Sequence, residues 1–357
     1  MTRQNSTDLM QWDTFLEASP LGQFQQSSKW GRVKSLEGWK PLHVPLHTRG
    51  SLSGGYLLLW KVTRFGRIGY ISKGPVLHEE NPEAVRVVLQ QAYETAKELR
   101  LRALIVQPPD LSSASMEDLQ SCGFSDFEVP GVITATLVLD VSGGVEVIDR
   151  HLSKAMRNEA RRAFKRGVTI QEGRRDDLPK FFQLMSETCV RQKTLPNPSR
   201  VELLQALWDE FQPQVWLRLA SVSEEIIAGL LMIGFGDRLI LWKKGWNYKR
   251  SDAHPNSLLH VDTLHWANAK GYKHCDFVGI DRSIAETILE GRALTEAQIR
   301  SRHMFNLRLG ATPLLLPPAQ ILVVSPVIRL FCHYLLRSYK MRITKLFPFA
   351  SAWMARQ

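Results

Sequence analysis

Basic side chains recur at helical spacing in the segment 145–166. Lys154, Arg157, Arg161 and Lys165 follow one another at intervals of three or four residues, which places them on one face of a helix. Such a face can bind the phosphates of RNA with little sequence specificity. A solvated helix face that binds nothing explains the same pattern equally well, and both interpretations stay open.

The chain as a whole is also positively charged. Its 357 residues include 46 Lys and Arg against 35 Asp and Glu, which gives a formal net charge of +11. This excess favours a polyanionic partner: RNA, a nucleotide or pyrophosphate, or an anionic membrane surface. The charge does not choose among these three.

Two further positions offer groups that bind anions or sugars. Arg191 ends a predicted helix over 178–191. Its guanidinium suits bidentate binding of phosphate or carboxylate, although a cation at a helix C-terminus is also favoured by the helix dipole. Trp242 and Lys244 are expected on one face of a predicted strand over 238–245. Trp242 either stacks against a substrate or belongs to the core.

The chemistry that these residues support needs no covalent enzyme nucleophile. Asp276, in a predicted strand over 274–278, is either a general base or an internal carboxylate bonded to backbone. The chain has no Gly-x-Ser-x-Gly and no cysteine–histidine signature. Its four scattered cysteines lack metal-binding spacing and are typical of reduced cytoplasmic thiols. We therefore expect neither a metal nor another cofactor.

The elements that must position these residues predict an α/β fold in two halves. Each half reads as strands, a helix and a strand around a mixed sheet. The main predicted elements of the first half are strands over 53–62 and 102–106 and a helix over 82–100. Those of the second half are helices over 145–166, 178–191 and 258–270, and strands over 215–222, 225–235, 238–245 and 274–278. The repeated order suggests internal duplication.

The last segment, 326–357, differs in composition from both halves. Residues 327–345 predict a basic amphipathic helix, which either lies on an anionic membrane surface or packs on the body of the protein. No stretch of about 18 uncharged apolar residues is present, and residues 1–10 lack a hydrophobic signal-peptide region. We expect a cytoplasmic monomer, peripheral to the inner face of the membrane if the last helix binds lipid.

Several short motifs stand in a fixed order along the chain. In the first half they are Gln26-Ser27-Ser28-Lys29-Trp30-Gly31-Arg32-Val33-Lys34, Ser72-Lys73-Gly74-Pro75 and Gln107-Pro108-Pro109. The middle and the second half add the segments 136–140, 152–163, 187–191, 258–267 and 271–280. In order and spacing they resemble the FemABX family, the aminoacyl-tRNA-dependent transferases that build peptidoglycan cross-bridges. The resemblance covers roughly residues 11–316.

The resemblance implies two tandem domains similar to GNAT acetyltransferases, with mixed sheets. Domain 1 would cover about 11–145 and regain a strand from about 312–325, and domain 2 would cover about 146–311. The implied reaction moves an amino acid from aminoacyl-tRNA to an amine of a UDP-linked or lipid-linked muropeptide. The basic face at 154–165 would then meet the tRNA acceptor arm.

The resemblance also implies roles for single residues. Lys34 would contact the nucleotide-linked precursor, where a lysine suits a diphosphate as a point charge. Arg191 would face the cleft between the domains. Trp242 stands where the family often has a tyrosine that it uses against the sugar-peptide substrate, and Lys244 would bind substrate beside it.

Two positions depart from the family. The lysine thought to stabilise the transition state is replaced by Asn306, and Arg308, or Arg302 before it, is a candidate substitute for its charge. The strand that usually ends in Asp-Pro ends in Gln107-Pro108, with Asp110 nearby.

The segment 254–257 lacks the glycines of a pyrophosphate-binding loop, which argues against CoA as the acyl donor. The two departures leave other functions open beside aminoacyl transfer. One is an N-acyltransferase that modifies an exopolysaccharide or lipid, and another is a non-catalytic binding module with the same fold. Aminoacyl transfer is the function that we predict.

Overall fold

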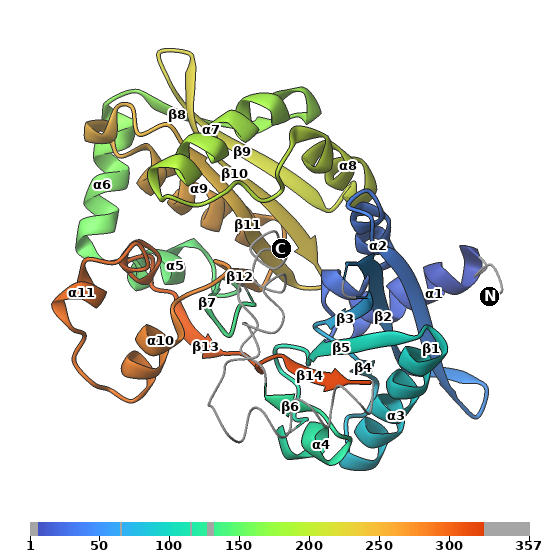
Figure 1. The fold of residues 1–357 in the computed structure, drawn as a ribbon. Coiled ribbons are helices and arrows are strands. Elements are labelled where there is room, and N and C mark those ends of the chain that lie inside the picture. The colour runs from blue at the N-terminus through green and yellow to red at the C-terminus, as the bar shows by residue number, and fades with distance from the viewer. Residues whose placement is uncertain (1–5, 65, 115, 127–131, 325–357) are drawn as a thin grey trace. The chain divides into compact units, whose positions relative to one another are not determined.

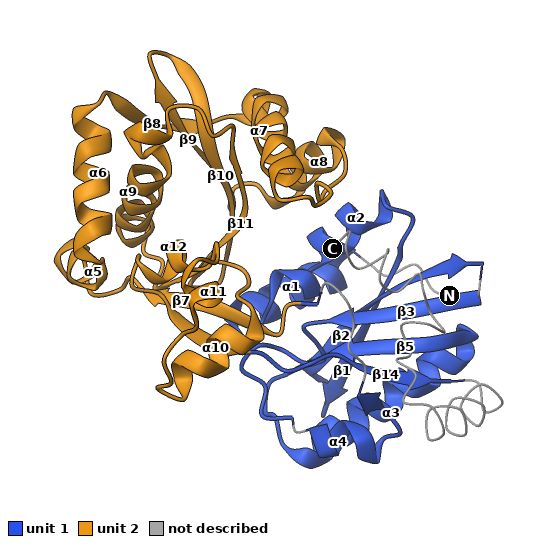
Figure 2. Ribbon diagram, turned by 60° about the vertical axis from the view of Figure 1, so that its left-hand side comes forward, with its two compact units in different colours: residues 1–132, 316–355, 357 blue, residues 133–315, 356 orange. Residues whose placement is uncertain are grey.

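The computed structural model describes residues 6–64, 66–114, 116–126 and 132–324, and the chain divides into two compact units (Figures 1 and 2). Of the described residues, those up to 132 and 316–324 belong to unit 1, and 133–315 belong to unit 2. The amphipathic helix predicted within 326–357 lies outside the described residues. In the described part of the chain, no helix is long and apolar enough to cross a lipid bilayer.

Unit 1 is built on a seven-stranded mixed sheet in the order β1-β2-β3-β5-β14-β6, with β4 paired to β2. Its strands are β1 (Lys40–Thr48), β2 (Ser51–Thr63), β3 (Gly66–Ser72), β4 (Val76–Leu77), β5 (Leu101–Gln107), β6 (Ser125–Asp126) and β14 (Gln320–Val323). Among the described strands of this sheet, only β3 and β5 pair in parallel. Its helices are α1 (Ser6–Ala18), η1 (Phe24–Gln26), α2 (Ser28–Ser35), α3 (Pro82–Glu98) and α4 (Met116–Ser121).

Helix α3 shows how the sequence specifies this unit. Asn81 caps its first turn by accepting a hydrogen bond from the Ala84 backbone N–H at 2.9 Å, and Pro82 occupies the first helical position. Its apolar residues recur at helical spacing and pack on the sheet as the core of unit 1. The predicted helix over 82–100 is therefore confirmed within two residues.

Unit 2 is built on a second seven-stranded mixed sheet, in the order β13-β7-β12-β11-β10-β9-β8. Its strands are β7 (Ala135–Asp140), β8 (Val168–Gly173), β9 (Val215–Val222), β10 (Glu225–Phe235), β11 (Arg238–Trp246), β12 (His274–Asp276) and β13 (Thr312–Leu315). Only β11 and β12 pair in parallel. The predicted α/β class, with a mixed sheet in each half, is confirmed.

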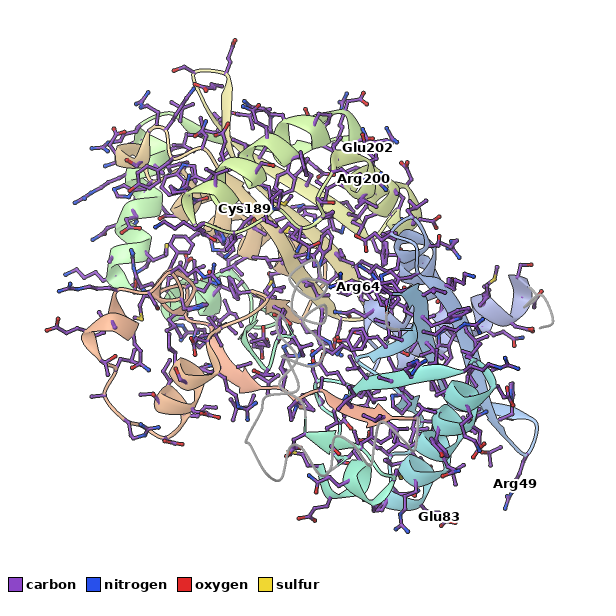
Figure 3. The ribbon with its side chains drawn as sticks, in the orientation of Figure 1. Arg49, Arg64, Glu83, Cys189, Arg200 and Glu202 are labelled. Carbon is purple, nitrogen blue, oxygen red and sulfur yellow. The ribbon has the colours of Figure 1, made fainter. Side chains whose placement is uncertain are left out.

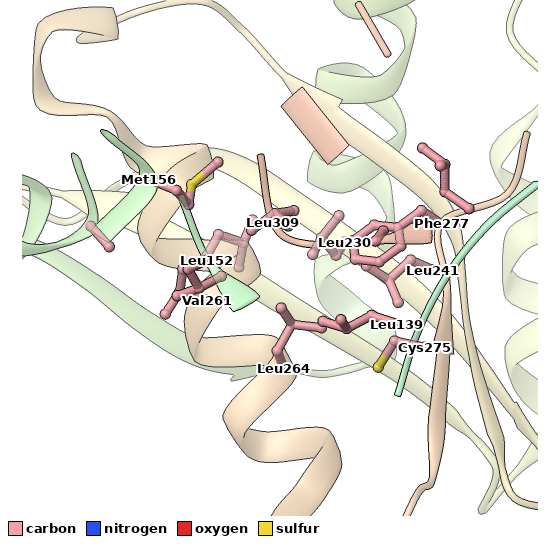
Figure 4. Packing of buried hydrophobic residues seen from close by; sticks show 14 of the residues in the cluster. Leu139, Leu152, Met156, Leu230, Leu241, Val261, Leu264, Cys275, Phe277 and Leu309 are labelled. Carbon is pink, nitrogen blue, oxygen red and sulfur yellow. The ribbon is translucent and has the colours of Figure 1, made fainter. Parts of the chain in front are cut away.

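Helices cover both faces of this second sheet (Figure 2). One face carries α7 (Leu178–Arg191) and α8 (Val201–Phe211), and the other carries α6 (Lys154–Lys165) and α9 (Pro255–Ala269). The remaining helices are α5 (Val145–His151), α10 (Arg282–Leu289), α11 (Glu296–Ile299), α12 (Met304–Leu307), η2 (Arg175–Asp177) and η3 (Ser251–Ala253). Figure 4 shows the core on the α9 face, where Leu230 and Leu241 of the sheet meet Leu264.

Two boundaries differ from those expected from the sequence. The first unit ends at 132 rather than 145, because β7 pairs with β12 and β13 and so belongs to the second sheet. The strand that returns to unit 1 is β14, which pairs with β5, whereas residues 312–315 form β13 in unit 2. The segment 145–166, expected as one helix, is two, because Ser153 caps a new helix by accepting a hydrogen bond from Met156 N–H at 3.1 Å.

Candidate functional site

The basic face of α6 keeps three of its four expected cations in solvent. Lys154, Arg161 and Lys165 are exposed. Arg157 is half-buried and donates hydrogen bonds of 2.8 and 2.7 Å to the backbone oxygens of Asp149 and Leu152 at the end of α5. Arg157 therefore stabilises a helix C-terminus, and the exposed basic surface is smaller than the sequence pattern suggested.

Arg308 is held by an ion pair within unit 2. Its guanidinium contacts the carboxylate of Glu159 on α6, which also accepts a 2.7 Å hydrogen bond from Ser257 Oγ at the start of α9. Burial would raise the pKa of Glu159, but these hydrogen bonds and the Arg308 charge outweigh it and lower that pKa. Arg308 thus joins three elements of the fold, and its role as a substitute for the charge of a lysine at position 306 stays a prediction.

Arg191 ends α7, as the sequence predicts, and lies against aromatic rings. It donates a 3.1 Å hydrogen bond to the backbone oxygen of Trp246. Its guanidinium carbon is 5.7 Å from the Trp246 ring centre and 5.1 Å from that of Tyr248. The arginine is exposed, so these contacts orient it while leaving further donors toward solvent.

Lys244 on β11 emerges on the α9 face of the sheet. It pairs across the ladder with Leu230, whose side chain belongs to the core on that face. A register shift in the ladder between Leu231 and Ile233 interrupts the simple alternation along β11. Trp242 is half-buried, and its ring centre lies 4.6 Å from the ammonium of Lys243.

The pKa of Lys244 falls to about 8, first because surrounding protein desolvates the amine and second because of the charge of Arg302. The Lys244 side chain is nevertheless exposed to solvent, which disagrees with desolvation as the main cause of its lowered pKa. The exposed surface is the direct measure of solvent access, so Lys244 is accessible, and of the two causes only the charge of Arg302 acts in full to lower its pKa.

Asn306 and His260 are buried polar groups of unit 2. Asn306 on α12 is 4% exposed and His260 on α9 is 1% exposed. His260 is packed against Phe305, the neighbour of Asn306, with the ring centres 4.9 Å apart. Burial, and then the charge of Lys244, lower the pKa of His260 to about 3. Among the described residues, neither His260 Nε2 nor Asn306 Oδ1 has a hydrogen-bond partner.

Asp276 shapes a turn. Its Oδ1 accepts hydrogen bonds from Thr136 Oγ1 at 2.5 Å and from the Val278 backbone N–H at 2.8 Å. Thr136 Oγ1 in turn accepts from Gly279 N–H at 3.2 Å. The carboxylate thus fastens the end of β12 to β7, as expected for the structural role considered from the sequence, and its role as a general base stays a prediction.

The residues considered in unit 1 are also engaged. Lys34 near the end of α2 is 4% exposed; its ammonium is paired with the Glu37 carboxylate and lies 5.2 Å from the Trp30 ring centre. Gln107 Nε2 donates to the Pro317 backbone oxygen at 3.2 Å. Asp110 forms a buried ion pair with Lys73. A phosphate at Lys34 would share the ammonium with the Glu37 carboxylate.

Gln26, the first residue of the motif 26–34, holds several elements of unit 1 together. Gln26 Nε2 donates to the Ser72 backbone oxygen at 2.6 Å, and its Oε1 accepts from Leu57 N–H at 2.7 Å. Trp12 Nε1 donates to the Gln26 backbone oxygen at 2.8 Å. One glutamine therefore ties β2, β3 and α1 to the segment that leads into α2 and Lys34.

The sequence-predicted residues of unit 2 fall into separate groups. The charge of Lys244 acts on His260 and His303, whereas Arg308 is bound to α6 and Asp276 to β7. The sequence analysis missed His260, because a histidine at helical spacing in an apolar run is typical of an ordinary core residue. It missed Glu159 because the partners of this carboxylate, Ser257 and Arg308, are distant in the sequence. It also missed Phe164, which is 74% exposed on α6 beside Lys165. The cysteines Cys122, Cys189 and Cys275 of the described residues are free thiols, and Cys189 lies on α7 (Figure 3). Those described residues contain no cluster suited to a metal ion.

Comparison with solved structures identifies the class of fold. The crystal structure of FemX superposes with a TM-score of 0.76 at 18% identity, covering 92% of this chain and 99% of FemX. The structure of L-PGS from Bacillus licheniformis is more distant, with a TM-score of 0.50, 12% identity, and 86% and 95% coverage. At these identities the likeness shows the fold alone.

Comparison of sequences identifies the family. A model of the FemAB family matches residues 7–224, and the chain belongs to that family. It is 27% identical over 191 residues to the lipid II:glycine glycyltransferase of Staphylococcus aureus strain MRSA252, covering 49% of this chain and 45% of the relative. The same enzyme of Staphylococcus epidermidis strain RP62A is 27% identical over 203 residues, covering 53% and 48%. The match thus spans about half the length of these curated relatives.

Proposed function

We propose that this protein is an aminoacyltransferase that moves an amino acid from aminoacyl-tRNA to an amine of a peptidoglycan precursor. The observation that carries the proposal is the sequence match to lipid II:glycine glycyltransferases within a FemAB family match over 7–224. Their name also favours a lipid-linked muropeptide over a UDP-linked one as the acceptor.

The proposed reaction needs positioned groups rather than a covalent nucleophile. An amine attacks an activated ester, and the barrier is lowered by orientation and by stabilising the charge that develops on the acyl oxygen. Unit 2 offers two exposed cations for such a role, Lys244 on the α9 face of the sheet and Arg191 at the end of α7, which packs on the opposite face. These groups suit transfer between two large charged substrates.

The α6 surface supports tRNA as the carrier of the amino acid. Lys154, Arg161 and Lys165 are exposed there, and Phe164 presents an exposed ring beside them. Cations neutralise phosphates and an aromatic ring can stack on an unpaired base, which together suit the single-stranded end of a tRNA. The net charge of +11 acts in the same direction.

The test is transfer of a radiolabelled amino acid by the purified chain. Each charged tRNA would be offered with lipid II in detergent micelles or with UDP-linked muropeptide, and the product identified by mass spectrometry. We expect label on lipid II from one or a few tRNAs. No transfer to either acceptor from any of the twenty aminoacyl-tRNAs would refute the proposal.

The α6 surface is tested separately by charge reversal. In the triple variant Lys154→Glu, Arg161→Glu, Lys165→Glu we expect weaker tRNA binding and a flatter dependence on salt, because about three phosphate contacts are lost. Glu172→Lys, on exposed β8, serves as a charge-reversal control of the opposite sign. Unchanged tRNA affinity in the triple variant would exclude α6 as the RNA surface.

A further inference from the structure

One end of the unit 1 sheet carries a group of exposed cations. The pairing of Lys40 with Trp60 shows that β1 begins where β2 approaches its end. The pairing of Arg67 with Leu101 likewise brings the starts of β3 and β5 together at this end. We call the exposed cations found here the basic end of unit 1, and they are Lys40, Arg64, Arg67, Arg100 and Arg102.

Contacts connect several of these cations through one buried ring. The Lys40 ammonium and the Arg67 guanidinium both lie over the Trp60 ring, at 4.8 and 5.4 Å from its centre. Arg67 also donates a 2.9 Å hydrogen bond to the backbone oxygen of Leu99, and Arg100 is the next residue. Arg67 therefore links the start of β1 to the connection between α3 and β5.

The remaining two cations lie at the turn between β2 and β3. The Arg102 side chain lies against Gly66, where an added Cβ would come within 2.7 Å of the Arg102 Nε. Arg64 is exposed in the same turn, two residues before Gly66 (Figure 3). The five cations thus surround one end of three neighbouring strands, β2, β3 and β5 (Figure 2).

Little negative charge offsets the basic end. The acidic residues closest to it along the chain are Glu98, at the end of α3, and Glu37, which is paired with Lys34. With the described residues, no ion pair is formed by four of the five cations, Lys40, Arg67, Arg100 and Arg102. Their charge is therefore available to an anionic partner.

The described part of the chain also leaves the sheet at this end. β14 runs antiparallel to β5, and the Val324 N–H donates to the Arg102 backbone oxygen at 3.0 Å. Residues 325–357 follow directly, and more than half of them are apolar. They include no acidic residue and six basic ones, Arg329, Arg337, Lys340, Arg342, Lys345 and Arg356. A second cationic stretch, rich in apolar side chains, therefore starts beside the basic end.

This combination suits an anionic lipid surface better than it suits RNA. Surfaces that bind single-stranded RNA add exposed rings on which bases stack. Here Trp60 is 8% exposed and Trp39 is 4% exposed, and lysine ammonium groups lie over both rings. The apolar side chain beside Arg67 is the aliphatic one of Val62, which is 64% exposed. Clusters of about four to eight Lys and Arg next to apolar side chains are typical of proteins that bind anionic phospholipids.

We propose that the basic end of unit 1 docks on an anionic phospholipid bilayer. Its guanidinium and ammonium groups bind lipid phosphates, and Val62 meets the boundary of the acyl chains. Residues 325–357 add charge and apolar side chains to the same surface. The use of this docking rests on the proposed function, because a lipid-linked acceptor is confined to a bilayer and docking concentrates the enzyme around it. The binding itself requires neither substrate.

The binding test is flotation of the purified full chain with phosphatidylcholine vesicles, with and without phosphatidylglycerol. We expect binding to the vesicles that contain phosphatidylglycerol, and weaker binding as the salt concentration rises. One Lys or Arg at an anionic surface raises the affinity about fivefold. The double variant Arg100→Gln, Arg102→Gln should therefore bind about twentyfold to thirtyfold more weakly.

The matched control is the double variant Arg49→Gln, Arg86→Gln, which removes the same charge from the opposite end of unit 1. Arg49 lies in the turn between β1 and β2, Arg86 lies near the start of α3, and both are exposed (Figure 3). We expect this variant to keep the natural vesicle affinity, and both variants to keep the natural urea midpoint. Equal weakening by the two variants, or no weakening by the first, overturns the proposal.

A second measurement needs no variant. Lysines of the natural protein would be acetylated with and without phosphatidylglycerol vesicles, and the rate at each position followed by mass spectrometry. We expect vesicles to slow the acetylation of Lys40 and to leave that of Lys165, exposed on α6, unchanged. An unchanged rate at Lys40, or equal slowing at both positions, contradicts docking through the basic end.

RNA is the competing partner, and the α6 variant separates the two surfaces. The triple variant Lys154→Glu, Arg161→Glu, Lys165→Glu should keep the natural vesicle affinity, and the Arg100→Gln, Arg102→Gln variant should keep the natural tRNA affinity. If the latter variant instead loses tRNA affinity and keeps vesicle affinity, the basic end is an RNA surface and the proposal is overturned. A chain that binds vesicles as expected but transfers no amino acid refutes the proposed function and leaves the docking surface in place.

Discussion

Acid should unfold this protein through its buried histidines, and His260 is the clearest case. The group is 1% exposed, and burial and the Lys244 charge lower its pKa from 6.5 to about 3 in the folded state. Between pH 6.5 and pH 3, His260 is therefore protonated in the unfolded chain but not in the folded chain. The stabilisation is complete above pH 6.5 and is lost as the pH falls toward 3.

The magnitude follows from these two pKa values. One pKa unit corresponds to about 1.4 kcal/mol, so the free energy of unfolding should be about 2 kcal/mol lower at pH 5 than at pH 7.5 through this group alone. His43 in unit 1, whose pKa burial lowers to about 4, and half-buried His303 add to the loss in the same direction. Carboxylates contribute below this window, because their ordinary pKa values lie near 4.

The assay is urea unfolding at several pH values between 5 and 7.5 for the natural protein and for His260→Gln. The glutamine amide can still donate to Asn256 but takes up no proton, so we expect the slope of stability against pH to fall by about one proton, roughly 1.4 kcal/mol per pH unit. The control is His47→Gln, at an exposed position on β1, which should keep the natural slope. A His260→Gln variant with the natural slope would show that His260 is not a buried neutral imidazole.

Three further predictions concern unit 2. A double-mutant cycle of Arg308→Met and Glu159→Gln, followed by urea unfolding, should give a coupling energy of about 1–2 kcal/mol, since the pair is partly buried and charge-assisted; a coupling near zero would restore Arg308 as a free cation. Gly245→Ala should destabilise by about 2 kcal/mol or more in thermal melting, because its Cβ would lie 2.6 Å from the Met185 backbone nitrogen, and a neutral effect would contradict the close approach of α7 to β11. Asp276→Ala should lower the melting temperature, at a cost of about 1–3 kcal/mol for the donors left unpaired, with kcat preserved; a lost kcat at unchanged stability would make Asp276 a catalytic base instead.

Sequence periodicity predicted most elements of the fold, because their apolar faces are set locally. Helix α3 and strands β9 and β10 lie where apolar spacing and turn residues placed them. The break at Ser153 was missed, although serine is a strong N-cap, because the basic run on either side continued the helical spacing without interruption.

The candidate site was predictable in part. Lys244 was placed among the substrate-binding residues from its strand, but the register shift that brings it to the α9 face depends on pairing with β10. The contacts of His260 and Glu159 are made with residues more than 40 positions away in the sequence. His260 packs on Phe305, and Glu159 binds Ser257 and Arg308. Contacts of that kind leave no trace in local spacing.

The return of β14 to the first sheet has a consequence for synthesis on the ribosome. β14 pairs with both β5 and β6, so one edge of β5 has no neighbour until residues 320–323 emerge, about 210 residues after β5 itself. At 5–20 residues per second that interval lasts about 10–40 s. During it, an incomplete first sheet with an open strand edge coexists with a second unit that is being made and folded. The newly made chain therefore needs protection of that edge, by a chaperone or by its own transient structure, before the last strand closes the sheet.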